Sequence, residues 1–346
     1  MTRTSPTRTL RRVAASLSVA LLAVLTACST TTGGAGAASG SELSLVAFSV
    51  PKPAYDDLQK NFSGSADGKG ATWKSSYGPS GDQARAVMSG LKADYVGFSL
   101  ATDMTKLVDA NLVAKDWDAG ANKGIVSTSV VVIAVRKGNP LGIKDWDDLT
   151  KPGVKIVTPN PGSSGSARWN VLAAWSHITS NGGSEAEATE FLTKYYENIV
   201  SLPSSGREAT SAFTSGTGDV LISYENEAIA ARQSGADVDY IIPSTTLKIE
   251  NPGAVTVSAP DPAKKFLTYV ISDEGQKVFA SHGFRPLNAS VDPGTVEGAN
   301  DPAQPFPAIK KLVTIDDLGG WSAAATTFFD QKTGIVTKIQ DSSGVS

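Results

Sequence analysis

Apolar, β-rich runs alternate with helical stretches along most of this chain of 346 residues. The first such run covers residues 43–50, and the longest covers 126–136, where positions 130–135 are all apolar. An unbroken apolar run of this kind is typical of a strand that is covered on both faces. Helices between such strands form the covering layers. The pattern therefore predicts an α/β fold with mixed or parallel sheets.

The other predicted elements continue the alternation. Strands are expected at 93–98, 154–158, 219–224 and 240–242, and helices at 82–92, 166–179, 186–195, 263–271 and 274–281. The roughly 300 residues that follow position 42 are enough for two lobes.

Two stretches that carry Pro and Gly, at 138–140 and 251–253, are candidate crossings between the lobes. We therefore expect residues 43–128 and 252–346 to form lobe I and residues 129–251 to form lobe II.

The N-terminal segment has the pattern of an export signal. Four arginines, at positions 3, 8, 11 and 12, precede an apolar run over 13–25, and no acidic residue occurs before Glu42. A basic stretch before a short apolar run is typical of a secretory signal, and the run is too short to span a bilayer. It ends in Leu25-Thr26-Ala27-Cys28, the lipobox pattern of bacterial lipoproteins. The pattern predicts a signal peptide over 1–27 and a lipid on the thiol of Cys28; the alternative is an ordinary signal peptide with a chance cysteine.

Cys28 is the only cysteine, so a disulfide within the chain is excluded. Residues 29–41 contain only Ser, Thr, Gly and Ala, a composition typical of a flexible tether, which we assign to 28–42. The prediction is a monomeric protein held by a lipid anchor on the extracytoplasmic side of a cell membrane, in a periplasm or cell-wall space.

Charge and residue counts exclude several function classes. Without the four N-terminal arginines, 27 basic and 34 acidic residues remain, a formal charge of about −7, which argues against a nucleic-acid partner. With two histidines and one cysteine, the chain has no metal-ligand cluster. A glycine run that ends in Gly-Lys-Ser/Thr is absent, and no Ser/His/Asp order stands out. We expect no cofactor, no metal and no catalytic residue.

A Gly/Ser-rich turn opens a predicted helix three times, at 78–83, 160–166 and 204–208. The first main-chain N–H groups of a helix lack partners within the helix, and the helix dipole places about half a positive charge there. Three such starts that converge could hold a dianion without a Lys or Arg. The alternative is that each turn is an ordinary N-cap, because Ser, Gly and Asp are the usual capping residues.

Several segments together resemble the bacterial sulfate-binding proteins, which serve ATP-driven import of sulfate and thiosulfate. They lie at 80–84, 135–140, 145–149, 151–154, 158–170, 218–221, 225–228, 284–286 and 314–317, and the resemblance covers 43 to about 339. It implies a two-lobed periplasmic-binding-protein type II fold with the ligand in the cleft between the lobes. It also implies a membrane permease and an ATPase as partners.

The resemblance also implies the residues that bind sulfate, mostly through main-chain N–H groups at helix starts. Carried over position by position, these residues are Ser80, Ser164, Gly165, Ser166, Gly206 and Tyr224. The family has glycine where Ser166 stands and a tryptophan indole where Tyr224 stands. A phenol oxygen can accept as well as donate, so Tyr224 bears on the choice between sulfate and a protonated oxyanion.

The expected function is therefore capture of sulfate or thiosulfate by a protein that is not an enzyme. Two alternatives stay open: a binding protein for another tetrahedral oxyanion, such as phosphate or molybdate, and, less favoured, an ester hydrolase. We expect Arg168 and Arg207 to brace the binding backbone rather than touch the ion, and His177 and His282 to be surface or packing residues.

Overall fold

The computed structural model describes residues 41–344. The predicted signal peptide, Cys28 and nearly all of the predicted tether lie outside these residues. In the described part of the chain, no helix has both the length and the apolar character needed to cross a bilayer.

The described strands form one mixed sheet, whose main path is β2-β1-β3-β9-β4-β7-β5-β6. In that order the strands are Thr72–Gly78, Glu42–Phe48, Tyr95–Gly97, Thr245–Val255, Ile125–Arg136, Val220–Tyr224, Ile156–Val157 and Ile199–Ser201. Off this path, β8 (Val238–Ile241) pairs with β4, and β10 (Lys311–Val313) pairs with β9.

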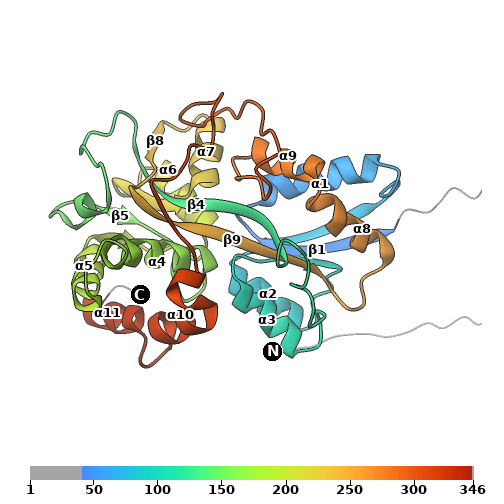
Figure 1. The fold of residues 1–346 in the computed structure, drawn as a ribbon, viewed down its shortest axis with the longest axis horizontal. Helices are drawn as coiled ribbons and strands as arrows, with labels where there is room; N and C mark the ends of the chain where they lie inside the picture. Colours follow the sequence, from blue (N-terminus) through green and yellow to red (C-terminus); the bar gives the residue numbers. More distant parts are fainter. Residues whose placement is uncertain (1–40, 345–346) are drawn as a thin grey trace, which may run out of the picture. The chain divides into compact units, whose positions relative to one another are not determined.

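The long antiparallel strands β4 and β9 connect the two lobes (Figure 1). The C-terminal end of β9 pairs with β3 in the first lobe, and its N-terminal end pairs with β10. Beyond its pairing with β9, β4 continues into the second lobe, where Val131–Val135 pair with β7.

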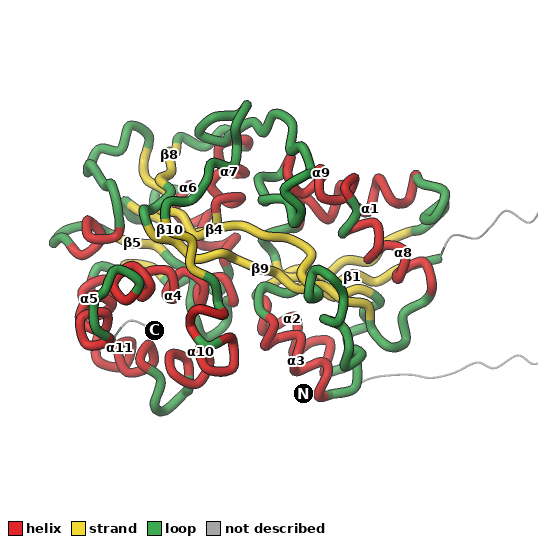
Figure 2. The backbone as a smooth tube through the Cα atoms, viewed as in Figure 1, coloured by secondary structure: helices red, strands yellow, loops and turns green. Residues whose placement is uncertain are grey.

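The first lobe has helices on both faces of strands β1–β3. Helices α1 (Lys52–Gly64), α8 (Asp261–Val270) and α9 (Asp273–Ser281) lie on one face, and α2 (Ser80–Met88) and α3 (Ala101–Asp109) on the other (Figures 1 and 2). Successive side chains of a strand point to opposite faces. Accordingly, Leu45 and Ala47 of β1 join the core cluster that contains Phe62 of α1, whereas Val46 packs with Val87 of α2.

The second lobe is built in the same way. Helices α4 (Gly165–Thr179) and α5 (Glu185–Glu197) cover one face of its strands, and α6 (Gly206–Thr214) and α7 (Glu225–Gln233) cover the other. In β4, Val131 and Ile133 share a core cluster with Trp169 of α4, whereas Val132 packs with Phe213 of α6. Burial on both faces explains the apolar run at 130–135 and confirms the predicted α/β class.

The C-terminal segment differs from the predicted division into lobes, which placed all of 252–346 in lobe I. Helix α11 (Ile335–Ser343) packs on α5, and the ring of Phe328 in α10 (Gly320–Phe329) lies 4.9 Å from that of Trp175 in α4. The physical reason is burial: the chain crosses the molecule again after α9, and Phe328 and Ile339 are covered by the second lobe rather than the first. Residues 138–140, predicted as a crossing, form a turn after β4 in which Asn139 has a φ of 49°.

Candidate binding site between the lobes

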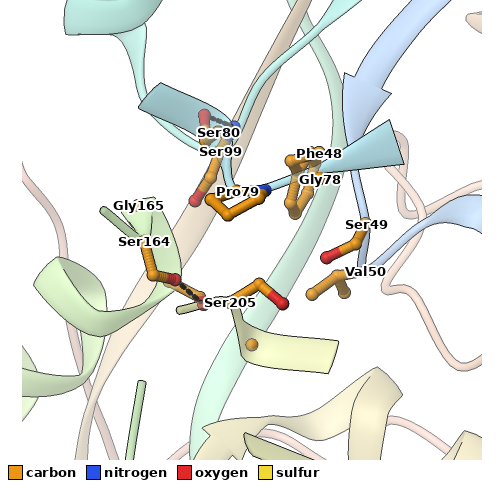
Figure 3. Close-up of a pocket in the computed structure, with 12 residues that line it drawn as sticks. Phe48, Ser49, Val50, Gly78, Pro79, Ser80, Ser99, Ser164, Gly165 and Ser205 are labelled. Atoms are coloured by element: carbon orange, nitrogen blue, oxygen red, sulfur yellow. Dashed lines mark hydrogen bonds between the residues drawn. The ribbon is translucent and has the colours of Figure 1, made fainter. Parts of the chain in front are cut away.

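The three predicted helix starts meet at one small hollow between the lobes (Figure 3). The first lobe lines it with Ser49, Val50, Ser80 and Ser99, among others, and the second lobe with 164–166, Ser205 and Gly206. The hollow has at most about 160 Å³ of empty space, which is too little for a drug-sized ligand. None of its lining residues carries a charged side chain.

Helix geometry supplies the donors in this hollow. Ser80, Gly165 and Gly206 are the first residues of α2, α4 and α6. Their main-chain N–H groups cannot bond within their own helices, and each helix adds the positive end of its dipole. Two of these helices belong to the second lobe and one to the first, so an anion held here would bridge both lobes.

Glycine is required at two positions of the hollow because neighbouring side chains lie too close for a Cβ atom, not because φ is positive. A Cβ on Gly165 would lie 2.6 Å from Cβ of Ser99, and a Cβ on Gly206 would lie 2.6 Å from Oγ of Ser166. Either addition would push apart side chains that line the hollow.

The serine residues in the hollow differ in which hydrogen-bonding groups remain available to a ligand. Oγ of Ser80 donates to Oδ2 of Asp103 at 2.7 Å and accepts from the N–H of Ser99 at 3.0 Å, so Ser80 offers its main-chain N–H. Ser164 and Ser166 share a hydrogen bond of 2.8 Å between their hydroxyls, so one of the two hydrogens stays available for a ligand.

Ser205, which the sequence prediction missed, caps α6 by accepting from the N–H of Glu208 at 3.2 Å. This acceptor role leaves its hydroxyl hydrogen available to the hollow.

Five of the six predicted residues line the hollow: Ser80, Ser164, Gly165, Ser166 and Gly206. Tyr224 does not line the hollow. Its phenol is buried and lies 2.8 Å from Oγ of Ser99, which does line it. Burial raises the pKa of Tyr224 well above its ordinary value, so the phenol keeps its proton at neutral pH.

Ser99 was also missed by the sequence prediction, although a signal for it exists. It follows β3 closely, and ligand residues of α/β folds gather beyond the carboxyl ends of strands. Ser49 and Val50, which follow β1, carry the same signal.

Charged residues surround the hollow without lining it. Arg207 pairs with the buried Glu227 at 2.7 Å and donates to the carbonyl of Val50 at 2.9 Å, while Nε of Arg168 donates to the carbonyl of Pro161 at 3.1 Å. Burial raises the pKa of Glu227, and Arg207 opposes that rise. These contacts hold the segments that carry Val50 and Pro161, and neither arginine lines the hollow.

The histidines lie outside the hollow, and each pairs with an aspartate. His177 contacts Asp147 at 2.9 Å and His282 contacts Asp57 at 2.8 Å. Within residues 41–344, no group of three or more His, Cys, Asp or Glu side chains is arranged to hold a metal ion.

Two lobes joined by long strands, with a hollow between them lined by helix starts, define a type II periplasmic solute-binding protein. A sequence profile of the family described as "Bacterial extracellular solute-binding protein" matches residues 43–285. The chain belongs to this family, and within it to the group that contains the sulfate- and thiosulfate-binding proteins.

Individual relatives support this placement over nearly the whole chain. The chain is 40% identical to the sulfate-binding protein of Synechococcus elongatus, over 91% of this chain and 92% of that protein. It is 35% identical to the thiosulfate-binding protein of Pseudomonas aeruginosa, over 86% and 91%. A solved structure, the sulfate-binding protein SubI from Mycobacterium tuberculosis H37Rv, is 43% identical, with a TM-score of 0.79 over 84% of this chain and all of that one.

Proposed function

We propose that this protein captures sulfate, with thiosulfate as a related ligand, outside the cytoplasm and delivers it to an ATP-driven importer. The observation that carries the proposal is the meeting of three helix starts, from both lobes, at a small hollow without charged side chains. Relatives named as sulfate- and thiosulfate-binding proteins support the same ligands.

The physical basis is the replacement of water by fixed donors. A dianion that leaves water needs hydrogen bonds to each of its oxygens, because a buried polar group without a partner is costly. Main-chain N–H groups at helix starts provide these bonds together with partial positive charge. Since the donors come from both lobes, binding favours the closed arrangement of the lobes.

A phosphate-binding protein or an ester hydrolase would need different residues in the lining of the hollow. Hydrogen phosphate carries a proton that needs an acceptor, and a hollow dominated by N–H groups offers few acceptors. An ester hydrolase needs a general base within reach of a nucleophile, and the lining residues include no histidine and no carboxylate. We therefore propose a binding protein without enzymatic activity.

The mode of attachment is part of the proposal. The sequence Leu25-Thr26-Ala27-Cys28 supports a lipid anchor on Cys28, with 28–42 as the tether of a monomer beside its permease and ATPase. Mass spectrometry of membrane-extracted protein tests the anchor: Cys28 is expected as the lipid-modified N-terminus, and an unmodified Cys28 contradicts it.

Titration calorimetry against sulfate, thiosulfate, molybdate and phosphate, repeated across pH, tests the function. We expect sulfate or thiosulfate to bind most tightly. Tighter binding of phosphate or molybdate would reassign the ligand, and turnover of a chromogenic sulfate ester would contradict the proposal.

A further inference from the structure

Every polar group of Ser99 has a partner, and the partners come from both lobes. Its N–H donates to Oγ of Ser80, and its carbonyl accepts from the indole of Trp169 at 2.9 Å and from Nδ2 of Asn251 at 3.2 Å. Its hydroxyl lies 2.8 Å from the phenol oxygen of Tyr224. Ser99 and Tyr224 are both fully buried, so neither hydroxyl has bulk water as an alternative partner.

Asn251 holds the carbonyl of Ser99. That carbonyl can only accept, which turns the amide nitrogen of Asn251 toward it, and the amide oxygen accepts from Ser127 at 3.4 Å. The hydroxyl of Ser99 is free to pair in another direction. The phenol of Tyr224 is fully buried, so its hydrogen needs an acceptor within the protein.

Oγ of Ser99 is the acceptor within reach. If Ser99 instead donated to Tyr224, the phenol hydrogen would be buried without a partner, which is unfavourable. The phenol of Tyr224 therefore donates to Oγ of Ser99. The hydroxyl hydrogen of Ser99 is then left to point into the hollow, where Ser99 lies against Gly165 (Figure 3).

We infer that Ser99 is a further ligand residue and that Tyr224 is a positioning residue, whose phenol donates to Oγ of Ser99 and so directs the Ser99 hydroxyl hydrogen into the hollow. This inference rests on the proposed function and adds a basis for its selectivity. A hydroxyl fixed as a donor matches an oxyanion without protons and is mismatched to the proton of hydrogen phosphate. Because Ser99 follows β3 of the first lobe and Tyr224 ends β7 of the second lobe, the pair is complete only when the lobes are closed.

The test is titration calorimetry of sulfate and of inorganic phosphate at neutral pH with the whole mature protein. The variants are Ser99→Ala and Tyr224→Phe. The matched control is Tyr196→Phe, which removes a buried phenol oxygen that has no partner in the structure and lies on α5. Melting curves without ligand check that each variant folds.

For Ser99→Ala, we expect sulfate affinity to fall about 10- to 100-fold through loss of a bond to a charged ligand. For Tyr224→Phe, the freed Ser99 hydroxyl can also accept, so we expect the preference for sulfate over phosphate to fall about 10-fold or more. Tyr196→Phe should change neither affinity nor preference.

Different failures separate the two proposals. A wild-type protein that does not bind sulfate overturns the proposed function. A wild-type protein that binds sulfate, with Ser99→Ala unchanged or with Tyr224→Phe weakening both ions equally, overturns this inference alone. If Ser99→Ala does not fold, the preference ratio of Tyr224→Phe decides.

Discussion

Two neighbouring hollows share Ser80's helix and the start of α4 but differ in their charges. The hollow between the helix starts has no charged side chain in its lining. The adjacent pocket, on the other side of Ser164 and Gly165, is lined by Arg85, Lys106 and Arg168 together with Asp103. Full positive charges therefore lie close to the hollow but outside its lining. The hollow offers helix dipoles and main-chain N–H groups, whereas the cations of the adjacent pocket pair with carboxylates or donate to a carbonyl.

The largest expected effect is on stability, and it tests whether Arg207 supports the fold or contacts the ion. Arg207→Met should lower the free energy of unfolding by about 3 kcal/mol, because it leaves Glu227 buried without its cation. Urea denaturation measures this change. The control Lys264→Met removes an exposed ion pair with Asp261 and should cost about 1 kcal/mol or less. A stable Arg207→Met protein that fails to bind sulfate would show that Arg207 contacts the ion.

The next effect concerns the close approach at α4. Gly165→Ala should weaken sulfate binding by about 2–3 kcal/mol, roughly 30- to 150-fold, because the new Cβ overlaps Ser99. Gly64→Ala is the matched control, since a Cβ at Gly64 meets no atom within 4 Å. Calorimetry measures both variants, and equal affinities would mean that the lobes do not close as tightly as in this structure.

A smaller effect is expected from the hydroxyl of Ser164. Ser164→Ala should lose about 1–3 kcal/mol of binding free energy if this hydroxyl pairs with the ion, as its place in the lining indicates. Ser163→Ala serves as the control, because Oγ of Ser163 donates to the carbonyl of Ser204 outside the hollow. An unchanged sulfate affinity in Ser164→Ala would indicate that Ser164 serves only as the N-cap residue of α4.

The smallest effect should come from the charged pocket. Arg85→Gln should change the equilibrium affinity by no more than about twofold and should slow association mainly at low salt, because an exposed cation steers an anion without binding it. Lys194→Gln, which removes an exposed cation paired on its own helix α5, is the control. Stopped-flow association rates at two ionic strengths give the measurement. A large, salt-independent loss of affinity would place the ion in the charged pocket.

Much of the lining of the hollow could be predicted because the helix starts that form it are local features of the chain. Each helix start depends on a few adjacent residues, such as Gly165 beside Ser164, whose turn chemistry is visible in the sequence. The buried strand β4 was visible for a similar reason, since its apolar run is continuous.

The features that were not predicted depend on residues far apart in the sequence. The hydroxyl of Ser80 is engaged by Asp103, and the place of Tyr224 behind Ser99 follows from a contact between lobes. Residues 251–253, predicted as a crossing between the lobes, form part of the connecting strand β9 rather than a separate turn, and a Cβ on Gly253 would lie 2.5 Å from the phenol oxygen of Tyr95. Packing at a distance, rather than local chain preference, decided these positions.

Uncharged donors from both lobes are proposed to hold a dianion. A crystal structure of the mature protein with bound sulfate would test this proposal most directly. We expect sulfate oxygens within hydrogen-bonding distance of the N–H groups of Ser80, Gly165 and Gly206, with no arginine or lysine nitrogen in contact. An ion bound instead to the guanidinium groups of Arg85 or Arg168, in the charged pocket, would contradict it.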